Sequence, residues 1–143
     1  RQYAADGWRV IACARDPAGA PELDAAAGAA RGETSVHALD VADAGSIATL
    51  ARELEGTAID VLLNNAGTMG AQSFARHGPT VQRFGHSDYD DWQHMFVVNA
   101  LGPMRMAEAF VEHVAASREK KIVTLTSIVG SIGSNSFGGM YAY

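Results

Sequence analysis

Residues 59 to 67 combine an apolar run with side chains that could contact a ligand. The run Ile59-Asp60-Val61-Leu62-Leu63 is rich in branched side chains, which is typical of a strand buried on both faces of a parallel sheet. Asn64-Asn65-Ala66-Gly67 then follows the carboxyl end of that strand. Asn can hydrogen-bond neighbouring backbone, whereas Ala and Gly let a ligand approach closely. Open α/β sheets bind ligands at this edge, but Asn and Gly are also ordinary turn residues, so both interpretations stay open.

The histidines and acidic residues show no metal-binding pattern. The five histidines have neither metal-ligand spacing nor Cys or carboxylate partners at such a spacing: His37, His77, His86, His94 and His113. A receiver-like α/β domain would need clustered acids for Mg²⁺, and none cluster here. We therefore expect no metal site.

The bulk properties describe one ordinary globular domain of 143 residues, with 48% hydrophobic and 19% charged residues. A net charge of -5 argues against a nucleic-acid partner, which requires clustered Lys and Arg. The apolar runs are too short to span a bilayer, and no secretory signal is visible. The single Cys13 lies in an apolar strand pattern, so we expect an inert, buried thiol and a reducing, cytoplasmic compartment.

Strands and helices alternate along the chain. Before the central strand we expect a helix end over residues 1–6 closed by Gly7, a strand at 8–14, a helix at 21–30, a strand at 34–39, and a helix from Ala44 to about Glu55 capped by Asp43. After it we expect a long loop at 68–86, either functional or mobile, and then a helix capped by Ser87 with Asp90 three residues later. Gly102-Pro103 predicts a kink or restart in this helix, which continues to about Ser117 before a strand at 122–126. The alternation predicts a doubly wound parallel sheet with right-handed crossovers, in a single domain over residues 1–143.

The order and spacing of four segments resemble the short-chain dehydrogenase/reductase family. They are Asn64-Asn65-Ala66-Gly67, Val98-Asn99-Ala100-Leu101-Gly102, Leu125-Thr126-Ser127-Ile128-Val129-Gly130, and the tail Gly138-Gly139-Met140-Tyr141-Ala142-Tyr143. The motif Ser-Ile-Val-Gly-Ser-Ile-Gly, followed by Tyr-Ala-Tyr, is most similar to the C-factor-like, carbonyl-reductase-like branch of the family. The resemblance covers essentially the whole chain.

The resemblance implies a catalytic tetrad of Asn, Ser, Tyr and Lys. Asn99 would hold a water that relays protons, and Ser127 would hydrogen-bond the substrate oxygen. Tyr143 would exchange the proton, and its neighbour Tyr141 competes for that role, although the branch usually uses the second Tyr of Tyr-Ala-Tyr. The family Lys, four residues later, would lie beyond this chain; it supplies the cation that a Tyr needs to ionise near neutral pH.

The resemblance also implies a nicotinamide cofactor. NAD-preferring members carry an acid where this chain has Ala14, and Arg15 beside it suits the 2′-phosphate of NADP. The alternative is that Arg15, next to Asp16, is only a solvated loop cation. Asp40 matches the acid that hydrogen-bonds adenine in relatives, or is a simple turn acid. Asn64 would brace the central strand, and the cofactor cleft would be lined by Asn65, Ala66 and Gly67.

The family's first strand and its Gly-rich turn have no counterpart in this chain, which begins at Arg1 without Met. We therefore expect a fragment of a longer protein, whose strands at 8–14 and 59–63 lack their common partner. The buried edges left unpaired should make these 143 residues alone unstable or aggregation-prone, and inactive.

Two functions remain in competition for the complete protein. The first is an NADP(H)-dependent oxidoreductase acting on a small carbonyl or alcohol, and the second is a catalytically weak, nucleotide-binding regulatory or signalling protein of the same fold. Lys four residues past Tyr143 would favour the enzyme. Family members commonly pair through long helices, so residues 88–117 are the expected face of a homodimer or homotetramer.

Overall fold

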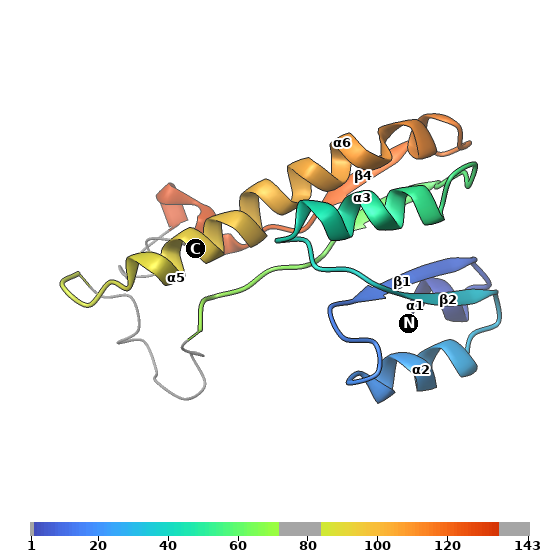
Figure 1. Ribbon diagram of the computed structural model, residues 1–143, viewed down its shortest axis with the longest axis horizontal. Coiled ribbons are helices and arrows are strands. Elements are labelled where there is room, and N and C mark those ends of the chain that lie inside the picture. The colour runs from blue at the N-terminus through green and yellow to red at the C-terminus, as the bar shows by residue number, and fades with distance from the viewer. Residues whose placement is uncertain (1, 72–83, 135–143) are drawn as a thin grey trace. The chain divides into compact units, whose positions relative to one another are not determined.

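Two pairs of parallel strands form the framework of the structure, a computed structural model that describes residues 2–71 and 84–134 (Figure 1). The chain divides into one unit of residues 1–54 and another of residues 55–143, and each is described by itself. The alternation of helices with parallel strands confirms the predicted α/β class. Among the described residues, β1 pairs with β2 and β3 pairs with β4.

The first unit combines three helices with a parallel pair of strands. Its elements are α1 (Gln2–Ala5), β1 (Val10–Ala14), α2 (Pro21–Gly28), β2 (Thr34–Ala38) and α3 (Ala44–Glu53). The strands pair in register from Val10 opposite Thr34 to Ala14 opposite Ala38. Asp43 caps α3 as predicted, because its carboxylate accepts a hydrogen bond from the Gly45 N–H at 2.8 Å. The buried side chains of α3, Ile47 and Leu50, lie three residues apart on one face.

The second unit pairs its two strands in the same parallel sense. Its elements are β3 (Val61–Asn64), α5 (Tyr89–Phe96), the π-helical turn η2 (Val97–Leu101), α6 (Gly102–Ala115), β4 (Lys121–Thr124), and 3-10 turns at η3 (Ile128–Gly130) and η4 (Ile132–Ser134). The register runs from Val61 opposite Lys121 to Asn64 opposite Thr124. Figure 1 shows α5 and α6 as one continuous helical run alongside β4. Met95 and Phe110 on that run are 0% and 1% exposed, so they anchor the core of this unit.

The predicted break at Gly102-Pro103 takes the form of one wide turn. Proline has no N–H, so Pro103 cannot donate to the carbonyl of Asn99, four residues earlier. The chain widens over Val97–Leu101, where the Gly102 N–H donates to the carbonyl of Val97, five residues back. Regular α-helix restarts at Gly102, with Pro103 in its first turn, where a missing N–H has little cost.

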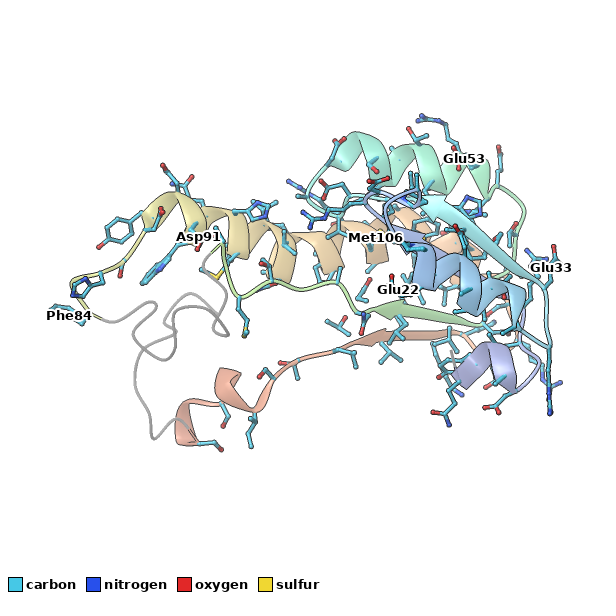
Figure 2. All side chains as sticks on the ribbon, turned by 90° about the horizontal axis from the view of Figure 1, so that it is seen from below. Glu22, Glu33, Glu53, Phe84, Asp91 and Met106 are labelled. Atoms are coloured by element: carbon cyan, nitrogen blue, oxygen red, sulfur yellow. The ribbon has the colours of Figure 1, made fainter. Side chains whose placement is uncertain are left out.

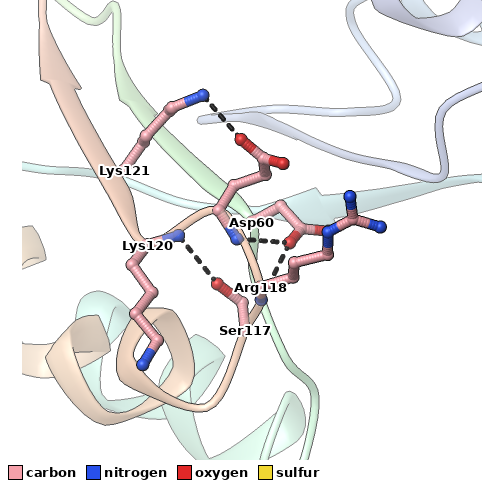
Figure 3. A network of polar contacts seen from close by, with 6 residues as sticks. Asp60, Ser117, Arg118, Lys120 and Lys121 are labelled. Carbon is pink, nitrogen blue, oxygen red and sulfur yellow. Dashed lines mark hydrogen bonds and ion pairs between the residues drawn. The ribbon is translucent and has the colours of Figure 1, made fainter.

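One carboxylate organises the connection between α6 and β4 (Figure 3). Oδ1 of Asp60, just before β3, accepts hydrogen bonds from the N–H groups of Arg118 and Glu119 at 3.2 and 3.1 Å. The carbonyl of Asp60 also accepts from the N–H of Lys121, at 3.1 Å. Ser117 closes the turn, because its hydroxyl donates to the carbonyl of Val114 and accepts from the N–H of Lys120. Asp60 therefore helps to set the register in which β4 enters beside β3.

The predicted boundaries of three elements were wrong, and hydrogen bonds explain two of the differences. The cap of α5 is Asp88 and not Ser87, because the Asp88 carboxylate accepts from two N–H groups, those of Asp90 and Asp91, each at 3.1 Å. β4 begins one residue earlier than expected and ends at Thr124, and β1 begins only at Val10. The N–H of Trp8 is used at the end of α1, where it donates to the carbonyl of Tyr3.

Cys13 is exposed on β1, so the prediction of a buried thiol was wrong. The prediction assumed a strand covered on both faces, whereas the described residues of this unit cover Cys13 incompletely. Partial burial nevertheless raises the pKa of the Cys13 thiol from 9.0 to about 11.

We expect alkylation of Cys13 to be slow at neutral pH and to accelerate up to about pH 11. The raised pKa favours the protonated native state, so this group's contribution to stability is complete below pH 9.0 and is lost as the pH rises to about 11. Peptide-resolved mass spectrometry after iodoacetamide treatment of the folded protein would measure the rate, with denatured protein as control. A folded-state rate that already levels off near pH 9 would contradict the expectation.

Candidate functional site

The carboxyl edge of β3 and β4 brings two predicted segments together. Asn64 pairs with Thr124, and the N–H of Leu125 donates to the carbonyl of Asn64 at 3.0 Å. Because the strands are parallel and in register, Asn65–Gly67 and Thr126–Ser127 both continue from the same edge. The second unit thus places the Asn-Asn-Ala-Gly segment and Ser127 at one end of its sheet.

Asn64 is a buried structural amide, with only 8% of its surface exposed. Its Nδ2 donates to the hydroxyl of Thr124 at 3.3 Å and to the carbonyl of Pro103 at 3.4 Å. Both contacts are long, but they link β3 to β4 and to the first turn of α6. Asn64 therefore holds the strand end in place and leaves the residues after it to face outward.

Asn65, Ala66 and Gly67 are exposed just beyond Asn64. Two of the three have no side chain beyond Cβ, so a flat group can approach their backbone. A Cβ at Gly67 would lie 3.5 Å from the Oδ1 of Asn99, which is an ordinary van der Waals distance. These exposed, small residues are the ones that the sequence predicted to line a cofactor cleft.

Asn99 holds the segment that follows Gly67 through two hydrogen bonds. Its Oδ1 accepts from the N–H of Thr68, and its Nδ2 donates to the carbonyl of Thr68, both at 2.8 Å. The two bonds satisfy the donor and the acceptor of one peptide residue 31 positions away in the sequence. One donor and one acceptor of the Asn99 side chain are thus used to hold the loop.

Ser127 follows β4 and begins a tight turn. Its carbonyl accepts from the N–H of Gly130 at 3.1 Å, and its side chain is half-buried. Of the predicted tyrosines, both Tyr141 and Tyr143 lie outside the described residues. The predicted approach of Asn99, Ser127 and Tyr143 to one another therefore stays a prediction.

In the first unit, Arg15 and Asp40 follow the paired ends of β1 and β2. The N–H of Leu39 donates to the carbonyl of Ala14 at 2.9 Å, so both residues lie beyond the same sheet edge. Arg15 is exposed and makes no hydrogen bond or ion pair to another described residue. The carboxylate of Asp16 lies over Gly19, where an added Cβ would come within 2.6 Å of Oδ2. Asp16 therefore packs over its own turn.

Asp40 uses one carboxylate oxygen within its own turn. Oδ1 accepts from the N–H of Ala42 at 2.9 Å, and the N–H of Asp40 donates to the hydroxyl of Ser46 at 3.0 Å. This geometry is that of the turn acid considered as the alternative role for Asp40. Oδ2 makes no hydrogen bond to another described residue, and the adenine role stays a prediction.

Sequence reasoning missed Asp91 and Thr68. Asp91 on α5 accepts a hydrogen bond at Oδ1 from the N–H of Ala71 at 2.9 Å (Figure 2). The hydroxyl of Thr68 accepts from the N–H of Gly70 at 3.1 Å. The available signal was an acid three residues after the cap of α5, but nothing in the sequence connected it to residues 20 positions earlier.

Neither a metal site nor a membrane span can be built from residues 2–71 and 84–134. No three His, Cys, Asp or Glu side chains in these ranges are grouped closely enough to hold a metal ion. Each helix there is too short or too polar to cross a bilayer.

Comparison with known proteins identifies the family. The family model for short chain dehydrogenases matches residues 1–142. The C-signal protein of Myxococcus xanthus is 35% identical over 85 residues, which are 59% of this chain and 46% of that protein. A 1-hydroxy-2-glutathionyl-2-methyl-3-butene dehydrogenase of Rhodococcus sp. strain AD45 is 33% identical over 123 residues, or 85% of this chain and 49% of that protein. The chain thus spans about half the length of these relatives.

Solved structures carry the same fold. A short-chain dehydrogenase/reductase from Burkholderia multivorans with bound NADP superposes with a TM-score of 0.74 at 28% identity, covering 99% of this chain and 58% of that one. A carbonyl reductase from Pseudomonas aeruginosa gives a TM-score of 0.75 at 26% identity, covering 99% and 63%. With a family model that matches residues 1–142, a Rossmann-like parallel α/β fold and these relatives, the chain belongs to the short-chain dehydrogenase family.

Proposed function

We propose that the complete protein is an oxidoreductase that transfers a hydride between NADP(H) and a small carbonyl or alcohol. The observation that carries this proposal is the double hydrogen bond between Asn99 and Thr68. It ties the helix that bears Asn99 to the chain just past Asn65–Gly67, the segment predicted to line the cofactor cleft. The similarity to a dehydrogenase and to a carbonyl reductase supports the reaction class.

In this mechanism the chain orients the substrate and moves a proton. Bound NADP(H) supplies or accepts the hydride. The hydroxyl of Ser127 would donate a hydrogen bond to the substrate oxygen as negative charge develops there. Tyr143 would give or take the proton, and a water on the backbone carbonyl of Asn99 would link it to solvent. Pro103 supports this last role, because it removes the donor that an α-helix would place on that carbonyl.

The exposed apolar surface of the helical run supports assembly into a homodimer or homotetramer. Tyr89 and Phe96 on α5 and Met104 on α6 are between 58% and 69% exposed. Large apolar side chains gathered on one helical surface are typical of subunit interfaces.

The reaction itself is tested by following a labelled hydride. The complete protein would be incubated with NADPH deuterated at the transferable position and with a panel of aldehydes and ketones. We expect deuterium in at least one product alcohol. NADPH binding without deuterium transfer to any product would contradict the enzymatic proposal. It would support the second candidate, a nucleotide-binding signalling protein, which the similarity to C-signal favours.

In the complete protein, we expect Arg15→Ala to raise the Kd for NADPH about 10- to 100-fold and to leave the Kd for NADH within about twofold. A charge-assisted contact to the 2′-phosphate contributes about 1.5–3 kcal/mol, which corresponds to that range. Arg15 is well suited to this contact because it is exposed and Asp16 packs over its own turn.

Arg118→Ala is the matched control, because Arg118 is also exposed but lies at the amino end of β4. Fluorescence titration measures both dissociation constants. Equal effects of Arg15→Ala on NADPH and NADH would contradict the assignment of Arg15 to the phosphate.

A further inference from the structure

The segment of residues 67–71 is held at two points by one helical run. Asn99 binds both backbone groups of Thr68, and Asp91 binds the N–H of Ala71. Asp91, Met95 and Asn99 are spaced four residues apart and so share a face of the run. Met95, between the two polar residues, is fully buried. This segment is therefore fixed at its start by Asn99 and at its end by Asp91.

The contact with Asp91 also depends on a glycine at position 70. Gly70 has φ +98°, a conformation that residues with a Cβ rarely adopt. A Cβ at Gly70 would also overlap the Oδ2 of Asp91. The carboxylate and the bare backbone of Gly70 thus fit together, and the N–H of Ala71 completes the contact.

Helix capping does not account for Asp91. Asp88 caps α5, and Asp91 is three residues later, where an acid can reach back to the N–H of the cap residue. Oδ1 of Asp91 instead accepts from Ala71, 20 residues earlier in the sequence. Figure 2 shows Asp91 on α5 where the segment that follows β3 passes the helix.

We propose that Asp91 is a positioning residue for the carbonyl substrate. This inference rests on the proposed function and goes beyond it. Residues 67–71 continue directly from Asn65–Gly67, the segment proposed to face the cofactor, and they lead away from Asn99 toward the rest of the loop. By binding the N–H of Ala71, Asp91 fixes the position of the backbone that would contact the substrate. Asn64 and Asn99 hold the backbone on the cofactor side of the proposed cleft.

The test separates substrate affinity from cofactor affinity in the complete protein. We expect Asp91→Ala to raise KM for the carbonyl about tenfold, the effect of losing one hydrogen bond to a charged group. The Kd for NADPH should stay within twofold. Asp91→Asn should give an intermediate KM, since its amide oxygen can still accept from Ala71. Asp90→Ala is the control, because this neighbouring acid is exposed and equally close to the amino end of α5.

A second comparison asks whether Gly70 is required because of Asp91. Gly70→Ala should raise KM more in the wild type than in an Asp91→Ala background, where the overlap with Oδ2 is gone and only the strain of φ +98° remains. An equal effect in both backgrounds would overturn the pairing. An Asp91→Ala variant with unchanged KM, or with NADPH affinity reduced as much as substrate affinity, would overturn the positioning role.

Amide hydrogen exchange keeps the inference separate from the proposed function. Exchange at Ala71 should be faster in Asp91→Ala and unchanged in Asp90→Ala, whether or not the protein turns over a substrate. Faster exchange at Ala71 in Asp91→Ala, together with a wild type that binds no NADPH, would leave the contact standing and remove its role in substrate binding. Unchanged exchange at Ala71 would remove the contact itself.

Discussion

Replacing Ser127 with alanine is expected to lower kcat about 10²- to 10³-fold, the usual cost of removing one donor to a developing oxyanion. Ser127 lies three residues past Thr124, and Gly67 lies three residues past the partner of Thr124, Asn64. The hydroxyl would therefore work at the same sheet edge as the segment proposed to face the cofactor. Its loss should act on the reacting oxygen and leave the NADPH Kd within about twofold, because the backbone of Asn65–Gly67 is untouched.

Steady-state kinetics with NADPH and a ketone that the wild type reduces would measure kcat. Fluorescence titration would measure the Kd for the cofactor. Ser131→Ala is the matched control, since Ser131 is an exposed serine between the two 3-10 turns. If Ser127→Ala retained kcat within twofold of the wild type, Ser127 would not contact the substrate oxygen.

Replacing Asn99 with leucine is expected to destabilise the protein and abolish turnover together. The substitution removes both hydrogen bonds to Thr68 and leaves an N–H and a carbonyl without partners. Two such losses amount to roughly 2–4 kcal/mol of unfolding free energy. Asn99→Asp should cost less, because a carboxylate can still accept from the N–H of Thr68, although it repels the carbonyl.

Urea unfolding and initial rates, measured on the same preparations, would show both effects. Gln93→Leu is the control, because it makes the same change of an amide to an apolar side chain at an exposed position on α5. An Asn99→Leu variant as stable as Gln93→Leu would mean that the bonds to Thr68 contribute little in solution.

Local chemistry made several features of the fold predictable from the sequence. The cap at Asp43 depends on a carboxylate and an N–H only two residues apart, and the strand β3 follows from a short run of branched side chains. The cap of α5 was misplaced by one residue because Ser87 and Asp88 both have capping side chains. The structure decides between them, because the Asp88 carboxylate accepts hydrogen bonds from two backbone N–H groups.

Contacts between distant residues could not be predicted in the same way. Asp60 meets Arg118 and Glu119 across 58 and 59 residues, and Asn99 meets Thr68 across 31. Such pairs depend on how β3, β4 and the helical run pack, which no local pattern encodes. Family resemblance singled out Asn99, yet the use of its side chain by Thr68, and the parallel use of Asp91 by Ala71, emerged only from the structure.

The wide turn over Val97–Leu101 is followed by a proline, whose covalent structure removes one hydrogen-bond donor from the helix. An imino acid at position 103 can never offer a proton to the peptide oxygen of Asn99, whatever the temperature, the salt or the ligand. The peptide oxygen of Asn99 therefore never has to be released from an N–H of residue 103, and a group that binds there need not supply free energy to break such a bond.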